Sequence, residues 1–436
     1  MEASVLPWLS CLAFAAIVAA FLLRYLQQRD TLLAWVLLGY FGACLTFIAV
    51  RWFWLTDLAV YDVDKYQTLG AQIAALLRAD FWGNLLNIWT SYAAYTLPLG
   101  LLYTVFGTSE PLGQFLNTVL GLGVILNLHR LATLWFSRRT ADYTALFAAL
   151  YPYGWVLGGT LNRDMMVVFC ITLLFRSLTE LQNQARRGSG VVLWLLALGS
   201  LFYMTMLRPP LFILGTLAMF VFWVVSPQAS LKRGSLFRTV RLMALGLLMF
   251  LTVTMYFLVG RYYTPRTDMG QEVTQFSDVD SMNERLKISE NAASAYLKGV
   301  TYSSYHQVVT AMPLASCYFL FSPFPWQVSS VKQTLGILDS TWLILVAIYF
   351  LRGIRPLYRG HRKVAWALLA FLVVGITTSS VLQANVGSAM RHRTMFTFFM
   401  FPVAVYGMTM GRSSRSALQS GNQAIGLRRP PAERCE

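Results

Sequence analysis

Long, continuous apolar runs separated by short polar turns dominate the chain, and strand-like alternation is not the prevailing pattern. A run of about 18 or more apolar residues is long enough to cross a bilayer, and a continuous run of that length favours a helix over a barrel strand. We therefore predict an all-α, polytopic membrane protein with about eleven transmembrane helices. The predicted spans are residues 5–24, 31–54, 113–136, 143–160, 164–181, 190–206, 210–226, 240–260, 333–351, 363–382 and 394–411.

Two further apolar stretches, about 94–107 and 308–324, are short or broken by proline, and we expect helices lying at the membrane interface. They fall in two long loops, about 55–112 and 261–332. Residues 1–411 are expected to form a single membrane domain. The tail from 412 to 436 is rich in Ser, Gly, Arg and Pro, so we expect it to be disordered.

The composition agrees with a membrane protein, because 56% of the 436 residues are hydrophobic and mean hydropathy is +0.54. The net charge of +16 raises the question of nucleic-acid binding, and the placement of the charge answers it. If the turn at 24–30 is cytoplasmic, that side holds 22 of the 35 basic and 5 of the 19 acidic residues. Such a bias is typical of cytoplasmic loops, so we predict the N-terminus outside, the C-terminus inside, both long loops outward and no nucleic-acid partner.

Several chemistries are excluded by missing patterns. The five cysteines show no paired spacing that would indicate a disulfide framework or a zinc site. The chain also lacks a phosphate-binding Walker loop, a zinc-protease HExxH and a hydrolase GxSxG in a strand–turn–helix context. We read the first apolar run as a retained helix, because no basic segment precedes it and no cleavage signal follows.

The candidate chemical groups gather on the predicted outer side. Three acids, Asp57, Asp62 and Asp64, begin the first outer loop, where a carboxylate can act as a general base. Arginine forks suit phosphate groups, and any one of these charges could also simply flank a span. Their convergence indicates an anionic, lipid-linked substrate. The candidate binding residues are Arg163, Asp164, Arg208, His306, Arg391, His392 and Arg393.

The stretch 94–181 resembles membrane glycosyltransferases of the GT-C superfamily, of the protein-mannosyltransferase and aminoarabinose-transferase type. The likeness rests on a Pro-Leu helix ending at Phe106–Gly107, on Asn117, on the basic turn at 138–139 and on the outer pair Arg163–Asp164. The segment "YDVDKYQTLGAQIA" resembles the acidic start of that family's first outer loop. The segments "ANVGSAMRHR" and "FSPFPW" are similar, more loosely, to membrane proteins of exopolysaccharide and O-antigen loci.

The resemblance implies a glycosyltransferase in a bacterial inner membrane that uses a polyprenyl-linked sugar donor, with Asp64 or Asp62 as the base. The acceptor would be a glycan, a lipid or a protein. A polymerase acting on lipid-linked repeat units, a lipid-linked sugar flippase and a non-catalytic scaffold remain alternatives at this stage. No cofactor is certain, although the acidic pair could recruit a divalent cation.

Overall fold

The computed structural model describes residues 13–22, 24, 31–53, 63–85, 93–183, 190–224, 278–290, 295–296, 298–328 and 331–426. Among these residues the fold is all-helical, as predicted, with one isolated β-bridge between Ala295 and Asn385. Besides the helix Ala13–Leu22, the helices are α2 Thr31–Phe53, α3 Val63–Ala79, α4 Phe81–Leu85, α5 Ala93–Phe106, α6 Glu110–Trp135, α7 Arg138–Ala149, α8 Pro152–Gly158, α9 Asp164–Asn183, α10 Gly190–Leu207, α11 Leu211–Val224, α14 Val279–Glu290, α15 Tyr305–Phe321, α16 Val331–Gly360, α17 Arg362–Ser380 and α18 Val386–Gly426.

Five helices of the described chain are long and apolar enough to cross a membrane: α2, α6, α10, α16 and α17. Large apolar side chains on their outer surfaces remain exposed, for example Leu195 on α10 at 65% and Leu351 on α16 at 72%. An apolar surface on a buried-core helix would instead be covered by protein, so these faces suit lipid. The protein is a multi-pass membrane protein, and the count of eleven spans stays a prediction.

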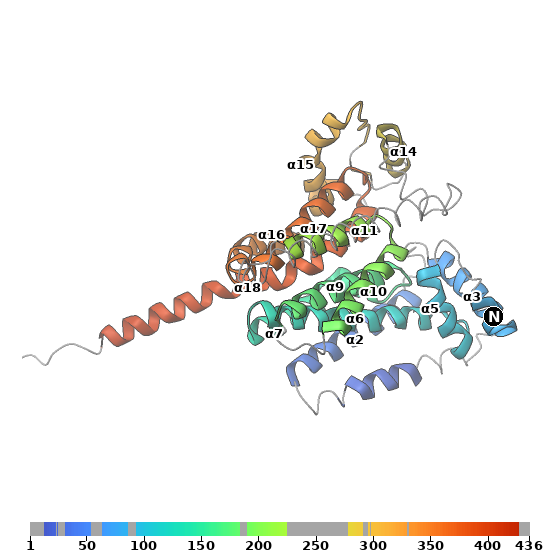
Figure 1. Ribbon diagram of the computed structural model, residues 1–436, viewed down its shortest axis with the longest axis horizontal. Helices are drawn as coiled ribbons and strands as arrows, with labels where there is room; N and C mark the ends of the chain where they lie inside the picture. Colours follow the sequence, from blue (N-terminus) through green and yellow to red (C-terminus); the bar gives the residue numbers. More distant parts are fainter. Residues whose placement is uncertain are drawn as a thin grey trace, which may run out of the picture.

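The predicted spans and the observed helices differ in two places, and one further predicted span has no described counterpart. The span 143–160 is divided into α7 and α8, because Pro152 lacks the N–H group that would continue the first helix. The span 240–260 lies outside the described residues. The last helix, α18, continues through the first part of the tail to Gly426, and Figure 1 shows this extension leaving the body of the molecule.

Both short apolar stretches form helices, α5 and α15. Figure 1 shows α5 beside α3 at one end of the molecule, and α15 near α14 at its upper edge. In between, α6, α9 and α10 pack in sequence, and α18 lies against α16, α7 and α9. The charged residues of the candidate site lie at the start of α9, in the turn before α11 and in the first turns of α18.

Helices α16 and α18 approach each other unusually closely. A Cβ atom at Gly353 would lie 2.0 Å from the carbonyl oxygen of Val403, and one at Gly407 would lie 2.2 Å from that of Tyr349. Only glycine leaves enough room for the two backbones at these points. The backbones of α16 and α18 are therefore in close contact at these two glycines.

Candidate functional site

A buried carboxylate lies at the centre of the site. Asp164 begins α9, and its side chain is fully buried. Its Oδ1 accepts hydrogen bonds from Nε of Arg208 at 3.1 Å and from Nη2 at 2.5 Å, and its Oδ2 accepts one from Nε of Arg391 at 2.8 Å. The carboxylate thus acts as a shared counter-ion that holds two guanidinium groups from distant parts of the chain.

The local sequence explains how these residues reach one point. Pro209 and Pro210 follow Arg208 and end α10, which leaves Arg208 in the tight turn before α11. Arg391 lies in the first turns of α18. Asp164 lies in the first turn of α9, where the positive end of the helix dipole favours an acid.

Buried polar side chains fix the turn before α9. The Asn117 amide of α6 donates to the carbonyl oxygens of Thr160 and Asn162, both at 2.7 Å. The Asn162 Oδ1 accepts from the backbone N–H of Met165 at 3.1 Å and so caps α9. Arg163, also buried, donates to the carbonyl oxygen of Leu207 at 2.9 Å, which ties this turn to the end of α10.

His392 extends the cluster. Its Nε2 lies 3.1 Å from Nη1 of Arg208. A guanidinium group has donors only, so Nε2 must be the acceptor, and the imidazole is neutral with its proton on Nδ1. The cluster therefore carries the charges of its arginines against one carboxylate, with no further positive charge from the histidine.

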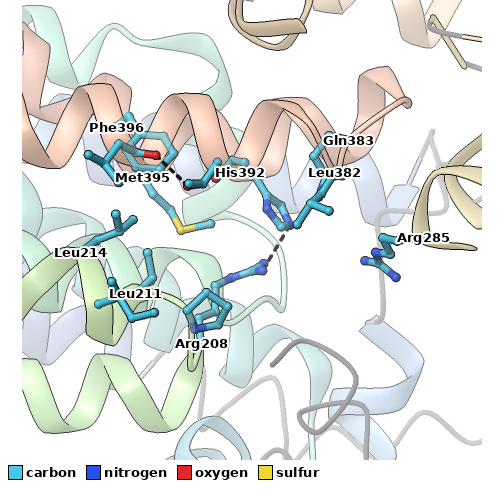
Figure 2. A pocket seen from close by; sticks show the side chains of 14 residues that line it. Arg208, Leu211, Leu214, Arg285, Leu382, Gln383, His392, Met395 and Phe396 are labelled. Atoms are coloured by element: carbon cyan, nitrogen blue, oxygen red, sulfur yellow. Dashed lines mark hydrogen bonds between the residues drawn. The ribbon is translucent and has the colours of Figure 1, made fainter. Parts of the chain in front are cut away.

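A pocket of about 300 Å³ opens beside this cluster. Figure 2 shows its two ends: Leu211, Leu214 and Met395 lie on one side, and Arg208, His392 and Gln383 lie towards the other. Ile213, at 52% exposure, lies on the apolar lining and reaches the outer surface of the bundle. The pocket thus joins a cationic end to an apolar slot.

One further arginine lines this pocket. Arg285 comes from α14, in the second long loop, and Figure 2 shows it beyond His392. It forms no ion pair or hydrogen bond with the described residues, unlike Arg208. The sequence did not single it out, although it lies in the helix-like stretch "MNERLKISENAASAYLKG".

The predicted residues divide into two groups. The structure brings Asp164, Arg208, Arg391 and His392 into one cluster, with Arg163 beside it. Of the other predicted residues that the structure describes, Asp64, His306 and Arg393 lie elsewhere and do not line the pocket.

Asp64 is exposed in the first turn of α3, and His306 is exposed in the first turn of α15. Asp57 and Asp62 lie outside the described residues. Asp64 therefore keeps its predicted role as a proposal only, as does Asp62.

Arg393 occupies a separate, fully buried site. It pairs with Asp339 of α16 and donates to the carbonyl oxygens of Leu320 at 2.7 Å and Ser322 at 2.6 Å. Asp339 also accepts from the Tyr151 hydroxyl at 2.5 Å. The sequence analysis missed Asp339, although an acid inside an apolar run is a recognisable signal for such a partner.

No group of three or more His, Cys, Asp or Glu residues is arranged to hold a metal ion in the part of the chain that the structure describes. The acidic pair suggested for a divalent cation includes Asp62, which is outside that part. A divalent cation therefore stays a prediction.

No protein-family model matches the chain, and no curated protein matches its sequence. Among solved structures, the oligosaccharyltransferase AglB from Archaeoglobus fulgidus, in complex with an inhibitory peptide and a dolichol-phosphate, is similar at 13% identity with a TM-score of 0.49. The match covers 91% of this chain and 52% of that one, so this chain spans about half of the archaeal enzyme. The apo form gives the same values.

ArnT from Cupriavidus metallidurans, bound to undecaprenyl phosphate, is similar at 17% identity with a TM-score of 0.38, over 90% of this chain and 81% of that one. The comparison thus finds GT-C-fold glycosyltransferases, the group that the sequence resembles, across about nine-tenths of this chain.

Proposed function

We propose that the protein is a membrane glycosyltransferase that moves a sugar from a polyprenyl phosphate or diphosphate donor to an acceptor at the outer face of a bacterial inner membrane. The pocket beside Asp164 carries this proposal. Its arginine-rich end suits a phosphate group, and its apolar slot suits an isoprenoid chain entering from the lipid side near Ile213.

Arg208 is the residue that we assign to the donor phosphate. Three of its N–H groups are used by Asp164 and His392, which leaves two of the five guanidinium N–H groups for a ligand. Asp164 holds the guanidinium in place before the donor arrives, and this preorganisation lowers the cost of binding. Arg391, on the other oxygen of Asp164, adds positive charge to the same end of the pocket.

The transfer step needs a base as well as a leaving group. An acceptor hydroxyl attacks the anomeric carbon, the bond from that carbon to the phosphate oxygen breaks, and the polyprenyl phosphate leaves with the electron pair. Asp64, or Asp62, takes the hydroxyl proton. The exposed position of Asp64 on α3 supports access to an acceptor in the outer loop. The expected orientation has the N-terminus outside and the C-terminus in the cytoplasm.

The test is a transfer assay with the purified protein and a polyprenyl phosphate-linked sugar. We expect Arg208→Ala to weaken donor binding by about 1.5–3 kcal/mol, the usual contribution of a charge-assisted hydrogen bond, and Arg208→Lys to restore only part of it. The matched control is Arg130→Ala, because Arg130 is 50% exposed and pairs with Glu180 outside the pocket. The absence of transfer and of donor binding in the parent protein would overturn the proposal, whereas chain extension of lipid-linked repeat units would identify a polymerase.

A further inference from the structure

Helix α14 presents a mixed face to the rest of the molecule. Met282 and Leu286 are buried and pack in a cluster with Tyr302, Val308 and Leu382. Ser289 accepts a hydrogen bond from the backbone N–H of Ala384 at 3.1 Å. Positions 282, 285, 286 and 289 follow helical spacing and share one side of α14, so Arg285 lies on the face that meets the α17–α18 turn.

A cation on that face requires an explanation. Glu284 and Lys287, on the opposite side of α14, are exposed, whereas Arg285 is half-buried and lines the pocket. Within the described residues no carboxylate pairs with it. Arg208, which lines the same pocket, already shares its carboxylate with Arg391. The polar end of the pocket therefore holds more positive than negative charge, and a buried or half-buried excess of this kind favours an anionic ligand.

We infer that Arg285 is a specificity-determining residue that binds the donor's phosphate group together with Arg208, so that the donor joins α14 to the helical core. This inference rests on the proposed function and extends it to a residue of the second outer loop. Arg208 approaches the pocket from the α10–α11 turn and Arg285 from α14 (Figure 2). A phosphate has several acceptor oxygens, so one group can accept hydrogen bonds from both guanidinium groups.

Two consequences separate this role from a structural one. Among the described residues Arg285 makes no ion pair and no hydrogen bond in the ligand-free protein, so Arg285→Gln should leave the melting temperature of that form unchanged or slightly raised. With ligand, α14 gains a contact to the core. Its backbone amides should then exchange hydrogen more slowly, because the bound state must open before exchange.

The experiment compares Arg285→Gln, Arg285→Lys and the control Lys287→Gln, all purified in full length. The probe is a polyprenyl monophosphate, with polyprenyl diphosphate and free inorganic phosphate as parallel arms. We expect Arg285→Gln to weaken binding of the lipid phosphates at least tenfold, Arg285→Lys to restore part of it, and Lys287→Gln to stay within twofold of the parent. Amides of residues 279–290 should be protected by the lipid in the parent and in Lys287→Gln, but not in Arg285→Gln.

The inference is overturned if Arg285→Gln binds the lipid phosphate like the parent, or if α14 shows no protection in the parent. A low melting temperature of ligand-free Arg285→Gln would indicate a structural role and would also overturn it. In these cases loss of binding in Arg208→Ala leaves the proposed function standing. Failure of the parent to bind either lipid phosphate overturns the proposed function itself, and binding of inorganic phosphate with equal affinity excludes recognition of a lipid.

Discussion

The substitution Asp164→Asn tests the central feature of the site, the single carboxylate shared by two arginines. Asparagine keeps the size of the side chain but removes the charge, and one of its two terminal atoms becomes a donor that faces Arg208 or Arg391. Three hydrogen bonds to charged groups, at 2.5, 2.8 and 3.1 Å, depend on the carboxylate. Removing one partner of a buried ion pair leaves an uncompensated charge and costs about 3–5 kcal/mol.

We therefore expect Asp164→Asn to lower the free energy of unfolding by about 3–5 kcal/mol. Unfolding from mild-detergent micelles can be followed by the fluorescence of the chain's 13 tryptophans. The control is Asp80→Asn. Asp80 is exposed, and its Oδ1 accepts a hydrogen bond from the backbone N–H of Gly83 at 3.0 Å, which an asparagine oxygen can also accept, so this change should cost less than about 1 kcal/mol.

A double-mutant cycle sharpens the result. If Asp164 and Arg391 stabilise each other, the variant carrying both Asp164→Asn and Arg391→Gln should be more stable than the sum of the two single changes, by about 1–3 kcal/mol. The reasoning is refuted if Asp164→Asn unfolds within about 0.5 kcal/mol of the parent, a difference ordinary for a surface change, or if the cycle shows no coupling.

Three further predictions concern other parts of the chain. Asp64→Asn should cut turnover by roughly 10²-fold while donor affinity stays unchanged, measured by initial rates and by titration, and full activity would remove it as the base. Asp339→Asn should destabilise the protein by about 3–5 kcal/mol in the same unfolding assay, and adding Arg393→Met should recover part of the loss, because no unpaired charge remains. After replacement of the native cysteines, the variant Glu284→Cys should react with an impermeant thiol reagent in intact spheroplasts, and Arg412→Cys should not. The reverse result would show that the topology is opposite to the predicted one.

Much of the fold was predictable because a membrane-spanning helix requires a long apolar run, which is visible in the sequence. The division of the predicted span 143–160 at Pro152 was also readable, since a proline inside an apolar run signals an end or a kink. The cluster around Asp164 was predictable in part. Because each predicted span crosses the membrane once, the alternation of helix ends places Asp164, Arg208 and His392 on the same predicted side of the membrane.

Helix geometry explains why three residues that are adjacent in the sequence have different partners in the structure. Arg391, His392 and Arg393 are consecutive, but each residue of a helix is rotated by about 100° from the last. Arg391 therefore reaches Asp164, His392 meets Arg208, and Arg393 turns away to Asp339. The place of Arg285 could not be predicted, because it depends on how α14 packs against the α17–α18 turn, about 100 residues further along the chain.

The glycine contacts between α16 and α18 have a consequence for motion. With Gly353 touching the backbone at Val403 and Gly407 touching it at Tyr349, neither helix can turn or slide past the other without a backbone collision. Arg391 and His392 lie on α18 and therefore keep a fixed orientation. We therefore expect a rearrangement that admits a long-chain substrate and releases a product to occur at the α10–α11 turn and at α14, which also line the pocket, and not between α16 and α18.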